Sequence, residues 1–329
     1  MHILIANNSK IPVELYGGTE RVIWYLGESL IKKGHTVTYL VEAGSQCYFA
    51  TVIIRDHSLS IEQQIPDEVD IVHLHYVPAN IEAIKQPILV TMHGNTNDDN
   101  LLHPNTVFVS ANHAERYGSK SFVHNGLNWD DYAAPVLSRH RTAFHFLGNA
   151  AWRVKNVQGA IDVVRKTDSE RLMVLGGQRF NISMGLRFTF SPRITFHRQV
   201  GGGYKTDLIN NSKGLIFPVK WNEPFGLAII ESFYYGCPVF GTPYGSLPEL
   251  VPSTVGFLTN DVNSLAEAIS HAESFDKNYC YEYARDVFNS DQMATKYIRY
   301  YEAVLNHESI NKEAPRLQNV LTTKFLPWH

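Results

Sequence analysis

Short apolar runs alternate with helical patterns along most of this chain, and this alternation restricts the fold more than any other feature. The runs predicted as strands in the first half are 2–6, 36–41, 70–75, 88–92 and 106–109. Those in the second half are 144–147, 172–175, 194–197, 215–217, 238–240 and 256–258. Because parallel strands need long crossovers, which are usually helices, the pattern predicts parallel sheets flanked by helices.

The clearest predicted helix covers residues 19–33, where apolar side chains recur at helical spacing. Thr19 is its expected N-cap, and Gly34 is expected to end it. The other predicted helices are 157–165, 204–210, 224–235, 263–272 and 292–305.

The alternation is interrupted between residues 128 and 141, where two aspartates and a proline precede a polar stretch. Two strand–helix series that meet at such a linker predict two doubly wound, Rossmann-like α/β domains facing one cleft. We place the N-terminal domain at 1–137 and the C-terminal domain at 138–290, followed by a final helix and tail at 291–329.

Composition excludes several classes of protein. The 329-residue chain has a formal net charge of −3, so no nucleic-acid partner is expected. His73 and His75 would share one strand face, but no third ligand lies near them in sequence, so we expect no metal site. No segment approaches the roughly 20 apolar residues that span a bilayer. The chain begins directly with a strand and has no signal-peptide pattern, so a cytoplasmic location is expected.

The segment E-P-F-G-L-A-I-I-E places Glu223 and Glu231 eight positions apart around a predicted helix start. Pro224 suits a first helical turn, so the helix should begin at about Pro224 or Phe225. Glu223 would then lie just ahead of N–H groups that can also hold a phosphate. Glu231 has apolar neighbours and needs polar partners, for which sugar or ribose hydroxyls are suitable. The alternative is a surface helix with two solvated acids.

This segment resembles the E-x7-E signature of retaining glycosyltransferases of family 4, which have the two-domain GT-B architecture. The stretch G-T-P-Y-G-S-L-P-E-L-V at 241–251 is similar to the family's G-G-x-P-E-L-V, with Ser246 where the second glycine is usual. The resemblance continues in order along nearly the whole chain. It implies an acceptor-side N-terminal domain, a C-terminal domain that binds a nucleotide sugar, and a final helix that crosses back to the first domain.

Two motifs of the first half fit this resemblance. Gly17 and Gly18 open the first long helix, and their pattern is not G-x-G-x-x-G, which argues against a nicotinamide or flavin Rossmann protein. They resemble the family's G-G loop near the donor phosphates and the acceptor, although a plain turn is the alternative. His93 matches the family's T-x-H position, whose histidine contacts the transferred sugar or positions the acceptor. Its alternative role is polar packing at a strand end.

The segment G-N-A-A-W-R-V-K-N at 148–156 lies where family members carry an Arg and a Lys that neutralise the departing diphosphate. Lys155 matches the lysine, but Asn149 stands at the position of the arginine. A neutral amide does not replace a guanidinium at a phosphate site. Arg153 is therefore the candidate for the second cation, unless both cations are simply solvated at a helix start.

The resemblance implies a metal-independent, retaining transferase of the hexosyltransferase type that needs no cofactor. Its donor substrate would be a nucleotide diphosphate sugar, with UDP or GDP as the nucleotide. Its acceptor would be a hydroxyl group of a sugar, glycolipid or small molecule, in polysaccharide, lipopolysaccharide or other glycoconjugate synthesis. Peripheral contact with the inner face of a membrane stays open. The implied catalytic residues are His93, Lys155 and Glu223, and the implied substrate-binding residues are Gly17, Gly18, Asn149, Arg153, Phe225, Gly226, Leu227 and Glu231.

Two other functions remain open at this stage. The first is an enzyme like the nucleotide-sugar 2-epimerases, which share the architecture but need acid and base residues around the sugar. The second is a non-catalytic nucleotide-sugar binding protein, suggested by Asn149 and Ser246.

Overall fold

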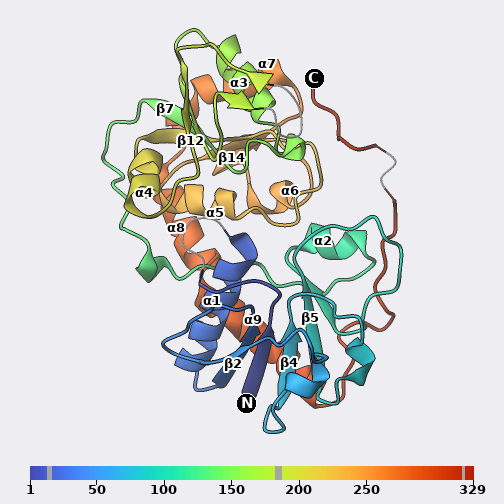
Figure 1. The fold of residues 1–329 in the computed structure, drawn as a ribbon. Helices are drawn as coiled ribbons and strands as arrows, with labels where there is room; N and C mark the ends of the chain where they lie inside the picture. The colour runs from blue at the N-terminus through green and yellow to red at the C-terminus, as the bar shows by residue number, and fades with distance from the viewer. Residues whose placement is uncertain (13–16, 182–186, 321–322) are drawn as a thin grey trace. The chain divides into compact units, whose positions relative to one another are not determined.

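The computed structural model describes residues 1–12, 17–181, 187–320 and 323–329. The chain forms two compact units, and each contains a parallel six-stranded sheet with helices (Figure 1). Unit 1 consists of Met1–Asn128 and Phe288–Val320, and unit 2 of Trp129–Val287 and Leu321–His329. The predicted α/β fold with two doubly wound sheets is confirmed.

In unit 1 the strand order is β3-β2-β1-β4-β5-β6. The strands are β1 His2–Ala6, β2 Thr36–Val41, β3 Thr51–Ile54, β4 Ile71–Leu74, β5 Ile88–Met92 and β6 Thr106–Phe108. The helices are α1 Gly18–Lys32, α2 Ala111–Arg116 and α9 Ser290–Leu305, and α9 packs against α1 and β5. The sequence did not predict β3 or α2, which are short.

The start of α1 differs from the prediction. Gly17 is the N-cap residue, no side chain caps this end, and Thr19 lies inside the first turn. The expected end is confirmed, because Gly34 adopts a φ of +86° directly after the helix, which is the conformation of a glycine stop.

In unit 2 the strand order is β11-β8-β7-β12-β13-β14. These strands are β7 Ala143–Leu147, β8 Leu172–Leu175, β11 Ile194–His197, β12 Ser212–Phe217, β13 Val239–Gly241 and β14 Gly256–Leu258. The helices are α3 Val157–Lys166, α4 Gly202–Asn210, α5 Leu227–Tyr234, α6 Leu247–Leu250, α7 Val262–Ser270 and α8 Lys277–Val287. A two-stranded antiparallel pair, β9 Phe180–Asn181 with β10 Arg187–Phe188, was not predicted, and neither were α6 and α8.

The core of unit 2 places α3 and α7 on one face of the sheet. Buried side chains of both helices, such as Ile161 and Leu265, join Phe144, Val174 and Phe240 of the strands in one apolar cluster. This packing fixes the strand ends, and with them the loops that leave the sheet. No helix within the described parts of the chain is long and apolar enough to cross a membrane.

A buried histidine in unit 2 makes stability depend on pH. His145 lies in β7, and its ring nitrogens contact the hydroxyls of Ser212 at 2.6 Å and Ser232 at 2.9 Å. Burial lowers its pKa from 6.5 to about 3. The neutral form is thus favoured in the folded chain, so the stabilisation is complete above pH 6.5 and is lost as the pH falls toward 3.

We expect urea unfolding to show this loss. At about 1.4 kcal/mol per pH unit, lowering the pH from 6.5 to 5 should cost about 2 kcal/mol through His145 alone. The variant His145→Gln should have a shallower pH dependence than the wild type, whereas His140→Gln, which changes an exposed ring, should keep the wild-type slope. Equal slopes for all three proteins would show that His145 does not titrate in this way.

Candidate functional site

The carboxyl ends of β7 and β12 mark the point in unit 2 where the strand order reverses. These strands are neighbours in the sheet, and the chain continues outward from them in opposite directions, to β8 on one side and to β13 on the other. In open α/β sheets, ligands bind beyond the carboxyl ends of the strands at such a switch point. The loops after β7 and β12 carry most of the residues predicted for the site.

Lys155 and Glu223 meet at this switch point. Lys155 follows β7 in a short 3-10 helix, Glu223 follows β12, and Lys155 Nζ donates to Glu223 Oε2 at 2.6 Å. The two side chains are 11% and 7% exposed, so the pair is largely shielded from water. Trp221 Nε1 donates to the same oxygen at 2.8 Å, and Lys155 Nζ lies 5.1 Å from the centre of the Trp221 ring. The pair is therefore a rigid, preorganised group of charges.

The loop that carries Glu223 is held by residues that come more than 20 positions later. Ser246 N donates to Glu223 O at 2.9 Å, and Ser246 Oγ donates to Phe225 O at 2.7 Å. A glycine at position 246 could make the first of these hydrogen bonds through its backbone N–H, but it has no hydroxyl to make the second. Gly245, with φ of +63°, lies so close that an added Cβ would come within 2.2 Å of Glu223 N.

Gly245→Ala should therefore disturb the site as well as the backbone. We expect a loss of stability of about 1–3 kcal/mol from the left-handed conformation alone, with a further loss from the clash. The matched control is Gly34→Ala, which has φ of +86° but no atom within 4 Å of the added Cβ. Thermal unfolding should show the larger loss for Gly245→Ala, because only that variant adds the clash with Glu223 N. Equal losses in both variants would contradict this account of the loop.

The helix after Glu223 begins later than predicted. Gly226 is the N-cap of α5 with φ of +90°, and Leu227 is the first helical residue, so Pro224 and Phe225 belong to the preceding loop. The prediction of a start at Pro224 or Phe225 was wrong, because the hydrogen bonds from Ser246 fix this loop. Ile229 N donates to Gly226 O at 2.9 Å, so the first-turn N–H groups of α5 that can donate to an anion are those of Leu227 and Ala228.

Glu231 lies inside α5 and is 3% exposed. Lys205 of α4 donates to Glu231 Oε1 at 2.6 Å, and the Tyr132 hydroxyl donates to the same oxygen at 3.2 Å. Glu223 is 6% exposed, so the alternative of a surface helix with two solvated acids is wrong. The sequence did not point to Lys205, because its place on α4 becomes informative only when the fold brings it to Glu231.

The loop after β7 carries two more predicted residues, Asn149 and Arg153, which lie in different environments. Asn149 Oδ1 accepts from Ala151 N at 3.0 Å, so the amide shapes a turn. Arg153 is exposed at the start of the 3-10 helix that ends with Lys155. Lys220, a cation that the sequence analysis did not select, is tied to the same turn, since its N donates to Val154 O at 2.7 Å.

The remaining predicted residues, Gly17, Gly18 and His93, belong to unit 1. Gly17 and Gly18 begin α1 directly after a stretch that lies outside the described residues. His93 follows β5, and its Nε2 lies 2.7 Å from His75 Nδ1. Burial lowers the pKa of His93 to about 4, so the ring is neutral at pH 7.

His75 is a candidate that the sequence analysis considered only as a metal ligand. It follows β4, which lies beside β1 at the switch point of the unit 1 sheet. Its Nε2 is buried and has no hydrogen-bond partner among the described residues. Within those residues no three His, Cys, Asp or Glu side chains form a group that could hold a metal ion. A hydroxyl group would suit this unpaired nitrogen.

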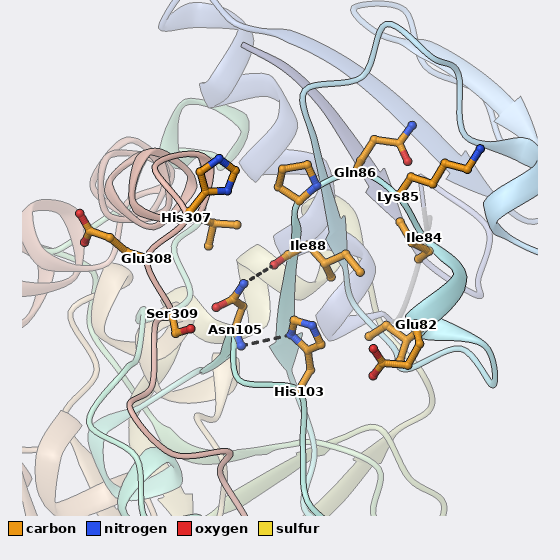
Figure 2. A pocket seen from close by; sticks show the side chains of 13 residues that line it. Glu82, Ile84, Lys85, Gln86, Ile88, His103, Asn105, His307, Glu308 and Ser309 are labelled. Atoms are coloured by element: carbon orange, nitrogen blue, oxygen red, sulfur yellow. Dashed lines mark hydrogen bonds between the residues drawn. The ribbon is translucent and has the colours of Figure 1, made fainter.

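The cavity drawn in Figure 2 lies at the amino ends of β5 and β6 in the unit 1 sheet, whereas His75 and His93 follow the carboxyl ends of their strands. Its volume is about 480 Å³, and Ile88 at the amino end of β5 lines it. Asn105 also lines the cavity: its Nδ2 donates to Ile88 O at 3.0 Å, and its backbone N donates to His103 Nδ1 at 3.1 Å. Because sheets of this kind bind ligands beyond the carboxyl ends of their strands, we assign no substrate to this cavity.

Comparisons with known proteins agree with this fold. Residues 141–273 match the family model described as glycosyl transferases group 1. The structure is similar to AviGT4, a glycosyltransferase involved in avilamycin A biosynthesis, with 19% identity, 93% of this chain and 98% of that chain covered, and a TM-score of 0.74. It is also similar to sucrose-phosphate synthase from Thermosynechococcus elongatus, with 16% identity, coverage of 93% and 100%, and a TM-score of 0.71.

A third similar structure is HepE from Anabaena in complex with UDP-glucose, with 14% identity, coverage of 92% and 100%, and a TM-score of 0.64. No curated protein matches the sequence. The GT-B fold is confirmed by these structures, and the residues that match the family model, 141–273, lie in unit 2.

Proposed function

We propose that the chain is a retaining, metal-independent glycosyltransferase whose unit 2 binds a nucleotide diphosphate sugar at the carboxyl ends of β7 and β12. The observation that carries this proposal is the buried contact between Lys155 and Glu223 at the switch point. A cation and a carboxylate held there match the two ends of the donor bond that breaks, a diphosphate and a sugar.

The diphosphate end is bound by positive charge. Lys155 and the first-turn N–H groups of α5 stabilise the charge that develops on the leaving diphosphate. Arg153 supplies a further cation, because Asn149 stands at the position where the resembled family carries an arginine. Side-chain cations and the helix N-terminus take the role that a divalent metal has in other transferases, which is why we propose activity without metal.

The sugar and ribose are bound by the two carboxylates. Lys155 has three N–H donors, so it can keep its bond to Glu223 and still donate to a phosphate oxygen. Glu223 thereby stays oriented to accept from hydroxyls of the transferred sugar. Glu231 accepts from the ribose hydroxyls, and Lys205 holds its carboxylate in place. The leaving phosphate takes the proton of the acceptor hydroxyl on the same face of the sugar, which retains the configuration.

The acceptor hydroxyl is assigned to unit 1. His93 and His75 are neutral at pH 7, because burial lowers the pKa of both rings. A neutral imidazole can orient a hydroxyl group without competing for the proton that the phosphate takes. The acceptor is a hydroxyl of a sugar, glycolipid or small molecule, and the Gly17–Gly18 backbone is proposed to bind substrate within unit 1.

The test is a panel of UDP-, GDP- and ADP-sugars, incubated with the full chain with and without EDTA, with nucleotide release as the measurement. We expect slow release of diphosphate from one donor, at the same rate after EDTA treatment, and a sugar product of retained configuration. Release of free nucleotide with an unsaturated sugar would favour epimerase chemistry. Binding without turnover would favour a non-catalytic protein, and loss of release in EDTA would contradict the metal-independent mechanism.

A further inference from the structure

The last residues of the chain, 324–329, bind to unit 2 as an extended segment, which we call the C-terminal segment. Leu326 N donates to Lys220 O at 2.8 Å, and His329 N donates to Asn260 O at 2.9 Å. Val262 N, at the start of α7, donates to His329 O at 2.7 Å, which places the C-terminal segment beside α7 (Figure 1). Trp328 packs against the apolar core of unit 2. The C-terminal segment is thus fixed at both ends.

Phe325 lies among cations in this arrangement. The Cζ atom of Arg153 is 5.0 Å from the centre of its ring, Lys220 Nζ is 5.1 Å away, and Lys324 Nζ is 5.9 Å away. An aromatic ring attracts cations over its face, so Phe325 offsets part of the repulsion among these like charges. Arg153 and Lys220 are otherwise long side chains with many rotamers, and the ring restricts both.

Two of these cations, Arg153 and Lys220, belong to the two loops that carry the candidate diphosphate site. Arg153 begins the 3-10 helix that ends with Lys155, and Lys220 follows β12 three positions ahead of Glu223. The bond from Lys220 N to Val154 O at 2.7 Å joins the two loops. Clustered cations repel one another, and a bound anion removes this cost, so the position of Phe325 bears directly on anion affinity.

We propose that Phe325 is a positioning residue of the donor site, and that it holds Arg153 and Lys220 toward the diphosphate. This inference rests on the function proposed above. It explains how Arg153 could act as the second cation although Asn149, at the usual position of that cation, is neutral. A purely structural role, in which the C-terminal segment only stabilises unit 2, is the competing explanation. In that case Trp328 and the backbone bonds would account for its effect.

The experiment uses the full chain and four probes: inorganic pyrophosphate, UDP, GDP and ADP. Dissociation constants are measured by calorimetry and thermal stability by the melting temperature. Phe325→Leu should weaken binding of pyrophosphate and of the preferred nucleotide about tenfold, with an unchanged melting temperature, because the apolar volume is largely kept. Phe325→Tyr should bind as the wild type does, since it keeps the ring. Phe190→Leu, at an exposed ring elsewhere in unit 2, is the control and should have no effect.

A double-mutant cycle separates positioning from packing. Arg153→Gln should weaken binding by itself, and Phe325→Leu should add little in the Arg153→Gln background, because both changes remove the same interaction. Unchanged affinity in Phe325→Leu would overturn the inference, and so would equal losses in the Leu and Tyr variants together with a lower melting temperature. If Phe325→Leu has no effect while Lys155→Met abolishes binding, only this inference fails. A wild-type chain that binds none of the four probes would overturn the proposed function and this inference together.

Discussion

Lys155→Met should lower the rate of nucleotide release by about 10²–10³-fold, because it removes the cation that we propose stabilises the charge of the leaving diphosphate. The same variant should weaken the binding of the diphosphate product, since Lys155 is proposed to contact it before and after transfer. The rate is measured at saturating donor, and the dissociation constant by calorimetry. Met keeps most of the apolar stem of Lys155 but removes the ammonium, which lies 5.3 Å from the centre of the Phe217 ring and 5.1 Å from that of Trp221.

Breaking a buried ion pair also costs stability, about 3–5 kcal/mol for a fully buried pair. The chain offers a matched control in Lys213, which pairs with Glu170 at 2.9 Å with side chains 22% and 15% exposed. Lys213 lies near the amino end of β12, away from the switch point. Lys213→Met should lower the melting temperature but leave the rate intact. If both variants lose activity to the same degree, stability and not transition-state binding explains the loss.

Glu223→Gln should lower the rate on the order of 10²-fold without weakening the binding of the diphosphate. The carboxylate is proposed to hold the transferred sugar, and a misplaced sugar loses the near-attack geometry on which transfer depends. Diphosphate affinity should be kept or increased, because Lys155 no longer shares its charge with a paired carboxylate. The two variants thus separate the two ends of the broken bond.

The measurement is again nucleotide release at saturating donor together with calorimetry of the diphosphate product. Gln has the shape of Glu, and Trp221 Nε1 can still donate to the side-chain oxygen. A Glu223→Gln variant with wild-type turnover would refute the role given to this carboxylate. A variant that loses diphosphate affinity as strongly as Lys155→Met would instead place Glu223 on the phosphate side.

Most strands could be predicted from sequence because they are short apolar runs, and β4 and β8 are buried along their whole length. The edge strand β3, whose end residues are exposed, could not be predicted in this way. The start of α5 could not be predicted either, although its sequence has a proline suited to a first turn. The hydrogen bonds from Ser246 fix that loop, and they depend on tertiary contacts between segments that are distant in the chain. Helix patterns report local preference, and such contacts override it.

The candidate site was predicted in part for the same reason. The spacing of Glu223 and Glu231 identified both carboxylates but gave no sign of their partners, Lys155 in a 3-10 helix and Lys205 in α4. The C-terminal segment has no periodic pattern, so its place on unit 2 follows only from backbone bonds and from Trp328. Residues that act through pairing across elements are visible only once the fold is known.

The position of a bound nucleoside diphosphate tests the central claim most directly. Crystals of the full chain soaked with UDP, GDP or ADP, whichever binds best in solution, would reveal it. The account predicts a diphosphate within hydrogen-bond reach of Lys155 Nζ and of the first-turn N–H groups of α5, at the carboxyl ends of β7 and β12. A diphosphate bound anywhere else on the chain, with Lys155 still paired only to Glu223, would contradict it.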